Sequence, residues 1–118
     1  MSQFSKIIAG TMTWGTWGKN FTPSEMSSLI EGALSLGIST FDHADIYGGY
    51  TTEAAFGAAF KDSNVDRSQV QFISKCGIQY PSEARPLKVK HYDYSAEHII
   101  WSVEQSLQNL NTEYLDVL

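Results

Sequence analysis

The chain has 118 residues, of which 42% are hydrophobic and 13% aromatic, and its formal net charge is −5. Enough apolar side chains are present for one globular core, so the composition excludes an intrinsically disordered segment. The eight lysines and arginines form no run, which argues against a nucleic-acid surface, and no stretch approaches the roughly 20 apolar residues of a membrane-spanning helix.

The first third of the chain predicts a strand, a loop and a helix. Residues 6–10 contain a short β-branched run that stops at a glycine, which is typical of a strand. The run Thr22-Pro23-Ser24-Glu25 combines a hydroxyl N-cap, a proline at the first helical position and a glutamate three residues on. Apolar residues then recur on one face of the predicted helix, at Met26, Leu29, Ile30, Ala33 and Leu34. Gly37 is placed to end this helix.

The middle of the chain predicts two strands with a helix between them. Residues 38–41 and 70–74 are short, apolar and β-branched, as buried strands are. A helix is predicted to start near Thr52 and to break at Asp62, because alanines and phenylalanines dominate the residues between them.

The last third predicts a loop, a helix and a strand. Residues 77–94 are polar, contain two prolines and show no periodicity, which predicts a long loop. Ser95 is a hydroxyl N-cap for a third helix. The apolar face of that helix carries Ile99, Ile100, Val103, Leu107 and Leu110. Residues 114–118 begin a fourth strand.

Strands and helices alternate along the chain, which favours a parallel sheet built from right-handed crossovers. A TIM (β/α)8 barrel takes about 250 residues, so four parallel strands and three helices correspond to roughly half of one. A small open, doubly wound sheet fits the same order. We therefore expect one partial α/β domain over residues 1–118, and the pattern leaves both architectures open.

Polar residues follow the predicted strands where an active site is expected in either architecture. Asp42 ends the second strand, Tyr47 lies five residues on, and Lys75 follows the third strand. An ammonium group beside a tyrosine favours the ionised phenol, and a carboxylate beside the ammonium keeps that group charged and oriented. Tyr47 could then donate a proton to a substrate oxygen on which negative charge develops.

Four stretches resemble the aldo-keto reductase family. The run Phe41-Asp42-His43-Ala44-Asp45-Ile46-Tyr47-Gly48 is similar to the D-x-A-x-x-Y-G signature of that family. Ile73-Ser74-Lys75 matches the strand that carries the family lysine. Glu53-Ala54-Ala55-Phe56-Gly57 resembles the E-x-x-[LVF]-G stretch, and residues 105–110 resemble the S-L-x-x-L helix. The likeness extends from about residue 7 to residue 118.

The resemblance implies the amino-terminal half of a TIM barrel that reduces an aldehyde or ketone with NADPH. Asp42, Tyr47 and Lys75 are then the catalytic residues, and the loop after the first strand lies near the nicotinamide ribose. The resemblance therefore implies that Gly10, Thr11, Met12 and Asp42 contact the cofactor. Trp14 and Trp17, with Tyr47, are candidates for a substrate wall, although both tryptophans could equally be packing residues.

One catalytic position of the family is missing from the chain. The resemblance implies a histidine after the fourth strand, in a pattern that begins here at Leu115-Asp116, and the sequence stops at Leu118. We therefore expect a fragment, a truncated product or one partner of a split barrel that is inactive alone. The alternative is a non-catalytic half barrel that assembles with itself or with a complementing chain through its open edges. An open nucleotide-binding sheet is disfavoured because no GxGxxG motif is present.

The remaining polar residues are assigned ordinary roles. We expect Asp45 to be a solvated loop residue, and His43 to be a polar wall residue or a hydrogen-bonded loop residue rather than a proton donor. His91 and His98 are expected at the surface or in a helix cap. Cys76 is expected to be a small packing residue.

Cysteine usage and the amino terminus indicate the compartment. One cysteine cannot form an internal disulfide, and no second Cys or paired His stands at metal-ligand spacing, so no metal site is expected. The first ten residues lack the long apolar run of a signal peptide. We therefore expect a cytoplasmic protein without a membrane or nucleic-acid partner.

Overall fold

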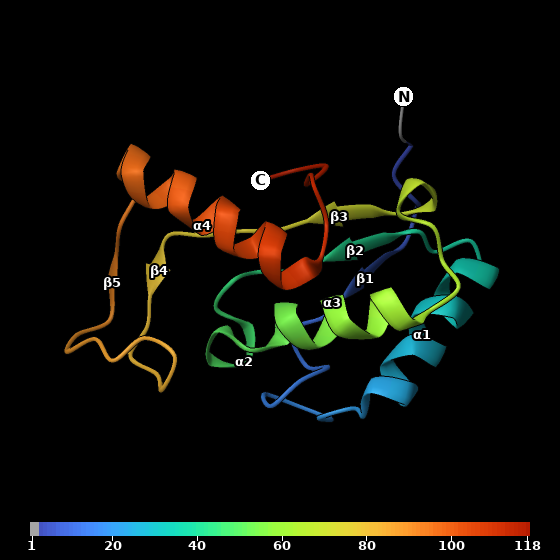
Figure 1. Ribbon diagram of the computed structural model, residues 1–118, viewed down its shortest axis with the longest axis horizontal. Coiled ribbons are helices and arrows are strands. Elements are labelled where there is room, and N and C mark those ends of the chain that lie inside the picture. The colour runs from blue at the N-terminus through green and yellow to red at the C-terminus, as the bar shows by residue number, and fades with distance from the viewer. Residues whose placement is uncertain (1–2) are drawn as a thin grey trace.

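The computed structural model describes residues 3–118 and contains a parallel three-stranded sheet with helices on one of its faces (Figure 1). The strands β1 (Ile8–Gly10), β2 (Thr40–Asp42) and β3 (Gln71–Ile73) lie in the order β1-β2-β3. Gly10 pairs with Asp42, and Asp42 pairs with Ile73, so the carboxyl ends of the strands are aligned. The chain is thus an α/β unit whose strand ends meet at one edge.

Three helices follow the strands as the sequence predicts. They are α1 (Pro23–Ser35), α3 (Thr52–Asp62) and α4 (Ala96–Leu110). The predicted capping box of α1 is confirmed, because the Glu25 amide donates to Thr22 Oγ1 and the Thr22 amide donates to Glu25 Oε1, each at 3.2 Å. The Ser95 cap is confirmed by the bond from the His98 amide to its hydroxyl. Local sequence signals therefore place the helix starts correctly.

The hydrophobic core lies between the sheet and the three helices. Phe41 of β2 and Phe72 of β3 are fully buried and meet Phe56 of α3 with ring centroids 5.4 and 5.5 Å apart. The other buried members of this cluster are Met26, Ile30, Ala59, Phe60, Val70 and Leu110. Because side chains alternate along a strand, the neighbours of Phe41 in β2, Thr40 and Asp42, point to the opposite face of the sheet.

The predicted fourth strand is present only as an isolated parallel bridge between Ile73 and Val117. The Phe72 amide donates to the Asp116 carboxylate at 2.8 Å, where a continuous ladder would use a backbone carbonyl. Asp116 also accepts a bond from Arg67 at 2.9 Å. A side chain thus takes the place of one ladder bond, so the expectation of four paired strands is corrected to three strands and a bridge.

The segment predicted as a long loop contains two short antiparallel strands, β4 (Ile78–Gln79) and β5 (His91–Tyr92). They form a ribbon beside α4, away from α1 (Figure 1). Strands of two residues are too short to produce a period of two in the sequence, which explains why the pattern missed them. A single-turn helix, α2 (Tyr47–Tyr50), and a 3-10 turn, η1 (Arg67–Gln69), complete the elements.

The buried face of α4 differs from the predicted apolar face. Its buried residues are Ser102, Ser106 and Leu110, whereas Ile100 is 61% exposed. Ser106 donates to the carboxylate of Glu53 in α3 at 3.0 Å, so a small polar residue occupies the helix contact. Within residues 3–118, none of the helices has the length and apolar character needed to cross a membrane.

Candidate active site

Two of the predicted catalytic residues form an ion pair at the carboxyl ends of the strands. Asp42 is the last residue of β2, and Lys75 lies two residues beyond β3. Lys75 Nζ donates to Asp42 Oδ1 at 2.6 Å and to the His43 carbonyl at 2.7 Å. The side chains of Lys75 and Asp42 remain 48% and 35% exposed, so small molecules in solvent can reach the pair. Parallel neighbouring strands bring these residues together as the sequence predicts.

Tyr47 completes this cluster from α2. The Lys75 ammonium lies 5.4 Å from the centroid of the Tyr47 ring. Gly48 and Gly49, which follow Tyr47, have φ angles of 67° and 64°, a left-handed conformation that glycine adopts without steric cost. The Tyr47 hydroxyl takes part in none of the hydrogen bonds formed by residues 3–118. The phenol is therefore free to bond an incoming oxygen.

The residues at the end of β1 and in the loop after it differ in burial. Thr11 is fully buried, and its hydroxyl donates to the Asp42 carbonyl at 3.1 Å. Met12 is 49% exposed, and a Cβ atom at Gly10 would meet no atom within 4 Å. Gly10 and Met12 thus border open space beside Asp42, whereas Thr11 ties the end of β1 to the end of β2.

The two tryptophans, which the sequence could not distinguish, lie in different environments. Trp14 packs on the core, with ring centroids 6.3 Å from Phe41 and 6.1 Å from Phe56. Trp17 is 43% exposed, and its ring centroid lies 6.3 Å from that of Tyr47. Of the two, Trp17 therefore lies beside the candidate cluster, and Trp14 packs between the loop and the hydrophobic core.

His43 lies fully buried behind Asp42. Its Nδ1 atom is 2.9 Å from the Thr11 hydroxyl, and its ring centroid is 4.3 Å from that of Phe56. Burial, with smaller effects from the positive charges of Lys75 and Arg67, lowers the pKa of His43 to about 3. A neutral, buried imidazole that is hydrogen-bonded to Thr11 fits the structural role that the sequence favoured over proton donation.

Acid should destabilise the protein through His43. The folded pKa of about 3 lies below the ordinary value of 6.5, so the folded chain binds fewer protons than the unfolded chain between these values. Stability therefore decreases as the pH falls from 6.5 toward 3, by up to about 1.4 kcal/mol per pH unit. Urea denaturation should show a shallower decrease for His43→Asn. Equal slopes in the two proteins would contradict this, and His91→Asn, at an exposed position, is the matched control.

Asp45 corrects one of the sequence expectations, because it is buried and not solvated. It is 5% exposed, its amide donates to the Lys75 carbonyl at 3.0 Å, and one carboxylate oxygen lies 3.6 Å from Arg85 Nη2. Burial raises the pKa of Asp45, and the charge of Arg85 acts in the opposite direction. This pair could not be predicted from the sequence pattern, since Arg85 comes from a segment without periodicity.

Glu53 is a buried acid whose structural role the sequence pattern did not reveal. It is 2% exposed, and its two carboxylate oxygens accept bonds from Ser74 at 2.7 Å and from Ser106 at 3.0 Å. Burial raises the pKa of Glu53, and the two serine hydrogen bonds oppose that change. Because Ser74 directly precedes Lys75, this carboxylate links α3 and α4 to the backbone that carries the lysine.

The other polar residues singled out in the sequence are peripheral to the cluster. His91 is exposed, while His98 is half-buried and lies 3.2 Å from the Ser102 hydroxyl and 3.2 Å from Gln79 Nε2. Burial, and secondarily the charge of Asp45, raise the pKa of the Cys76 thiol, which keeps it protonated at neutral pH. Within the part of the chain that the structure describes, no group of three His, Cys, Asp or Glu could hold a metal ion.

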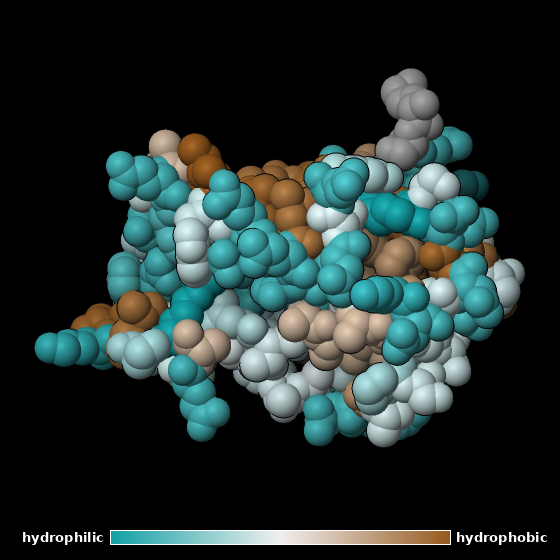
Figure 2. Space-filling model, in the orientation of Figure 1, coloured by the Kyte–Doolittle hydropathy of each residue, from teal (hydrophilic) through white to brown (hydrophobic). Residues whose placement is uncertain are grey.

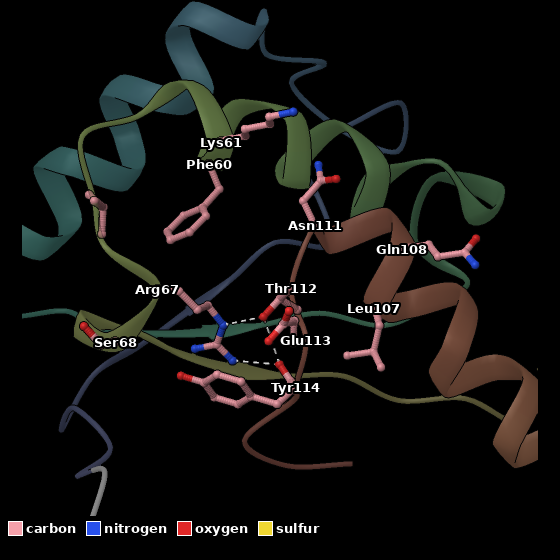
Figure 3. A pocket seen from close by; sticks show the side chains of 11 residues that line it. Phe60, Lys61, Arg67, Ser68, Leu107, Gln108, Asn111, Thr112, Glu113 and Tyr114 are labelled. Atoms are coloured by element: carbon pink, nitrogen blue, oxygen red, sulfur yellow. Dashed lines mark hydrogen bonds between the residues drawn. The ribbon is translucent and has the colours of Figure 1, made fainter.

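A large groove lies at the other end of the sheet, between the carboxyl-terminal ends of α3 and α4 (Figure 3). Its volume is about 820 Å³, and Arg67 occupies it, bonding Thr112 Oγ1 at 2.8 Å and the Tyr114 carbonyl at 2.9 Å. Arg67 precedes β3, whereas Asp42 and Lys75 stand at the opposite ends of the strands. The groove is thus separate from the candidate active site.

Comparison with known proteins gives one consistent result. The sequence profile of the Aldo/keto reductase family matches residues 6–118. Over 117 residues, or 98% of the chain, it is 48% identical to an uncharacterized oxidoreductase of Bacillus subtilis and 39% identical to the 6-dehydroglucose reductase of Agrobacterium fabrum. It covers 38% and 39% of those two proteins, so it spans less than two fifths of their length.

Solved structures agree with these relatives. An aldo-keto reductase of Bacillus halodurans in its holo form and the glycerol dehydrogenase of Gluconobacter oxydans each match with a TM-score of 0.76 and 26% identity. Each match covers 96% of this chain and 34% of the other. The matched structures are aldo-keto reductase TIM barrels, and the present chain corresponds to part of such a barrel.

Proposed function

Since the chain belongs to the aldo/keto reductase family, we propose that it forms the first part of a complete barrel that reduces an aldehyde or ketone to an alcohol with NADPH. The observation that carries the proposal is the ion pair between Lys75 and Asp42, at 2.6 Å, beside a tyrosine whose hydroxyl is free. Asp42 fixes the ammonium, and the ammonium stabilises negative charge near the phenol. Tyr47 gives its proton to the carbonyl oxygen.

The cofactor proposal concerns the open side of this cluster. NADPH, when bound, supplies the hydride that the carbonyl carbon accepts. The space beside Gly10 and the exposed side chain of Met12 fit a ligand that approaches Asp42 from the loop after β1. Thr11 contributes indirectly, because its buried hydroxyl donates to the Asp42 carbonyl at 3.1 Å and so holds the end of β2 in place. We place Gly10, Thr11, Met12 and Asp42 on the cofactor side, and Trp17 on the substrate side.

Apolar side chains are exposed on α4 and near the carboxyl terminus, which suggests that further structural elements cover this side of the sheet and of α4. Figure 2 shows apolar surface between α4 and the carboxyl-terminal segment. Ile100, Val117 and Leu118 are 61%, 41% and 56% exposed, and β1 is an edge strand. We propose that the remaining strands and helices of a barrel cover this surface, whether they come from the same chain or from a complementing one.

The reaction can be tested in a complete barrel that begins with this chain. Leu118 would be joined to the part of the Bacillus subtilis relative that follows its matching region, and the fused protein would be checked for a cooperative melt. We expect it to consume NADPH with a carbonyl panel that includes a nitrobenzaldehyde, and to do so faster than with NADH. A folded fusion that binds NADPH but reduces no member of the panel would show that the proposal is wrong.

A further inference from the structure

The turn that follows the proposed proton donor has an uncommon backbone. The Tyr47 hydroxyl takes part in none of the hydrogen bonds formed by residues 3–118, so the position of the ring depends on the backbone of α2. Gly48, Gly49 and Tyr50 have consecutive left-handed φ angles of 67°, 64° and 72°. Because a tyrosine is disfavoured in this conformation, contacts from outside the turn must stabilise it.

The side chain of Tyr50 makes such contacts. Its hydroxyl donates to the Ile78 carbonyl and accepts a bond from the Tyr80 amide, each at 2.8 Å. Arg85 lies over the same ring, with its guanidinium carbon 3.6 Å from the ring centroid. These contacts fasten α2 to the segment that contains β4, which lies at the same end of the molecule (Figure 1).

Arg85 also reaches the residue that supports the backbone of Lys75. Its Nη2 atom lies 3.6 Å from a carboxylate oxygen of Asp45, and the Asp45 amide donates to the Lys75 carbonyl at 3.0 Å. The side chains of Arg85 and Asp45 are only 13% and 5% exposed, so salt and water screen their attraction weakly. One buried cation therefore contacts both the turn after Tyr47 and the support of Lys75.

This arrangement bears on the distance between Tyr47 and Lys75. The Lys75 ammonium lies 5.4 Å from the centroid of the Tyr47 ring, where its charge stabilises negative charge near the phenol. Within residues 3–118, no hydrogen bond joins the two side chains, which come from α2 and from the segment after β3. Their separation thus depends on how the two backbones are held, and a misplacement of about 1 Å in a catalytic group can cost a large part of the rate.

We propose that Arg85 is a positioning residue of the proposed reduction, because it contacts both backbone supports and so sets the distance between Tyr47 and Lys75. This inference rests on the proposed reductase function. Arg85 touches neither substrate nor cofactor in this scheme, and it acts through Tyr50 and Asp45. Its loss should therefore lower kcat, whereas KM and the Kd of NADPH should stay nearly constant.

The first test is the double variant Arg85→Met/Asp45→Asn in the fused barrel described above. Arg85→Met alone would leave the Asp45 carboxylate buried without its partner and could unfold the protein, whereas the double variant leaves no unpaired charge. We expect kcat to fall by about 10-fold or more, while KM for the carbonyl substrate and the Kd of NADPH change by less than about 2-fold.

The second test removes the other contact and keeps the ion pair. Tyr50→Leu lacks the ring beneath Arg85 and the hydroxyl that bonds the backbone of β4, but it leaves the Asp45 carboxylate with its partner. This variant should show the same selective loss in kcat, again by about 10-fold. It therefore tests the inference even if the double variant does not fold.

Arg67→Met is the matched control. Arg67 is 17% exposed, its guanidinium lies over the rings of Phe72 and Tyr114, and it pairs with Asp116 at 2.9 Å. Its surroundings thus resemble those of Arg85, but it stands at the end of the sheet opposite to the candidate active site. Replacement of Arg67 should lower the melting temperature and leave kcat within about 2-fold of wild type.

Three results in an active wild-type fusion would overturn the inference without touching the proposed reaction. The first is a folded double variant or a Tyr50→Leu variant with wild-type kcat. The second is a loss that appears in KM or in the Kd of NADPH and not in kcat. The third is a loss of kcat in Arg67→Met as large as in the double variant. A wild-type fusion that folds and binds NADPH but reduces no carbonyl would instead contradict the proposed function itself, so the two failures are distinguishable.

Discussion

Replacing Tyr47 with phenylalanine in the fused barrel is expected to lower kcat by at least about 10²-fold and to leave NADPH binding intact. The change removes one hydroxyl and keeps the ring that faces Lys75 at 5.4 Å. Because that hydroxyl bonds no other group within residues 3–118, its removal should not disturb the fold. Steady-state rates with NADPH and fluorescence titration with the cofactor would measure the two effects separately.

The matched control for this change is Tyr114→Phe. Tyr114 is 47% exposed and lines the groove at the other end of the sheet, so loss of its hydroxyl should leave kcat unchanged. If Tyr47→Phe turned over substrate at the wild-type rate, another group would have to donate the proton. The role assigned to Tyr47 would then be withdrawn, although the Asp42–Lys75 pair would stand.

Replacing Gly57 with alanine should cause a large loss of stability. A Cβ atom at Gly57 of α3 would collide with the Asn109 carbonyl of α4 and lie 2.8 Å from Leu110 Cα. These are backbone atoms, so relief requires the two helices to separate. We expect a net destabilisation of at least about 2 kcal/mol, despite the better helix propensity of alanine.

Gly32 provides a control of the same chemistry in α1. A Cβ atom there would meet no atom within 4 Å, so Gly32→Ala should stabilise the protein by about 0.5–1 kcal/mol. Thermal melts of the two variants should therefore shift in opposite directions. A Gly57→Ala variant as stable as wild type would mean that α3 and α4 do not pack as closely as described.

The sequence predicted the Asp42–Lys75 pair because that pair depends on strand order. Asp42 ends β2 and Lys75 follows β3, and neighbouring parallel strands place such residues together. The Asp45–Arg85 pair and the position of Tyr80 depend instead on the path of residues 77–94. That path is fixed by individual side-chain contacts, which leave no periodic signal in the sequence.

The sequence pattern also did not predict which neighbours individual side chains pack against. Trp14 and Trp17 are the same residue type three positions apart, and only the turn between them determines that one meets Phe41 and the other Tyr47. In α4 the periodicity identified an amphipathic helix but not the side that meets α3. That side carries Ser106, whose hydroxyl donates to the buried carboxylate of Glu53 at 3.0 Å.

The Glu53 carboxylate has a consequence for how this sequence can diverge. Ser74 and Ser106 each satisfy one of its oxygens, and all three side chains are almost completely buried. Loss of either serine leaves an unpaired acceptor, and loss of the glutamate leaves two serine hydroxyls without that partner. Each single replacement is therefore unfavourable, while an apolar set introduced at all three positions is not. Substitutions at Glu53, Ser74 and Ser106 are therefore coupled, and the three positions should covary among descendants of a common ancestor.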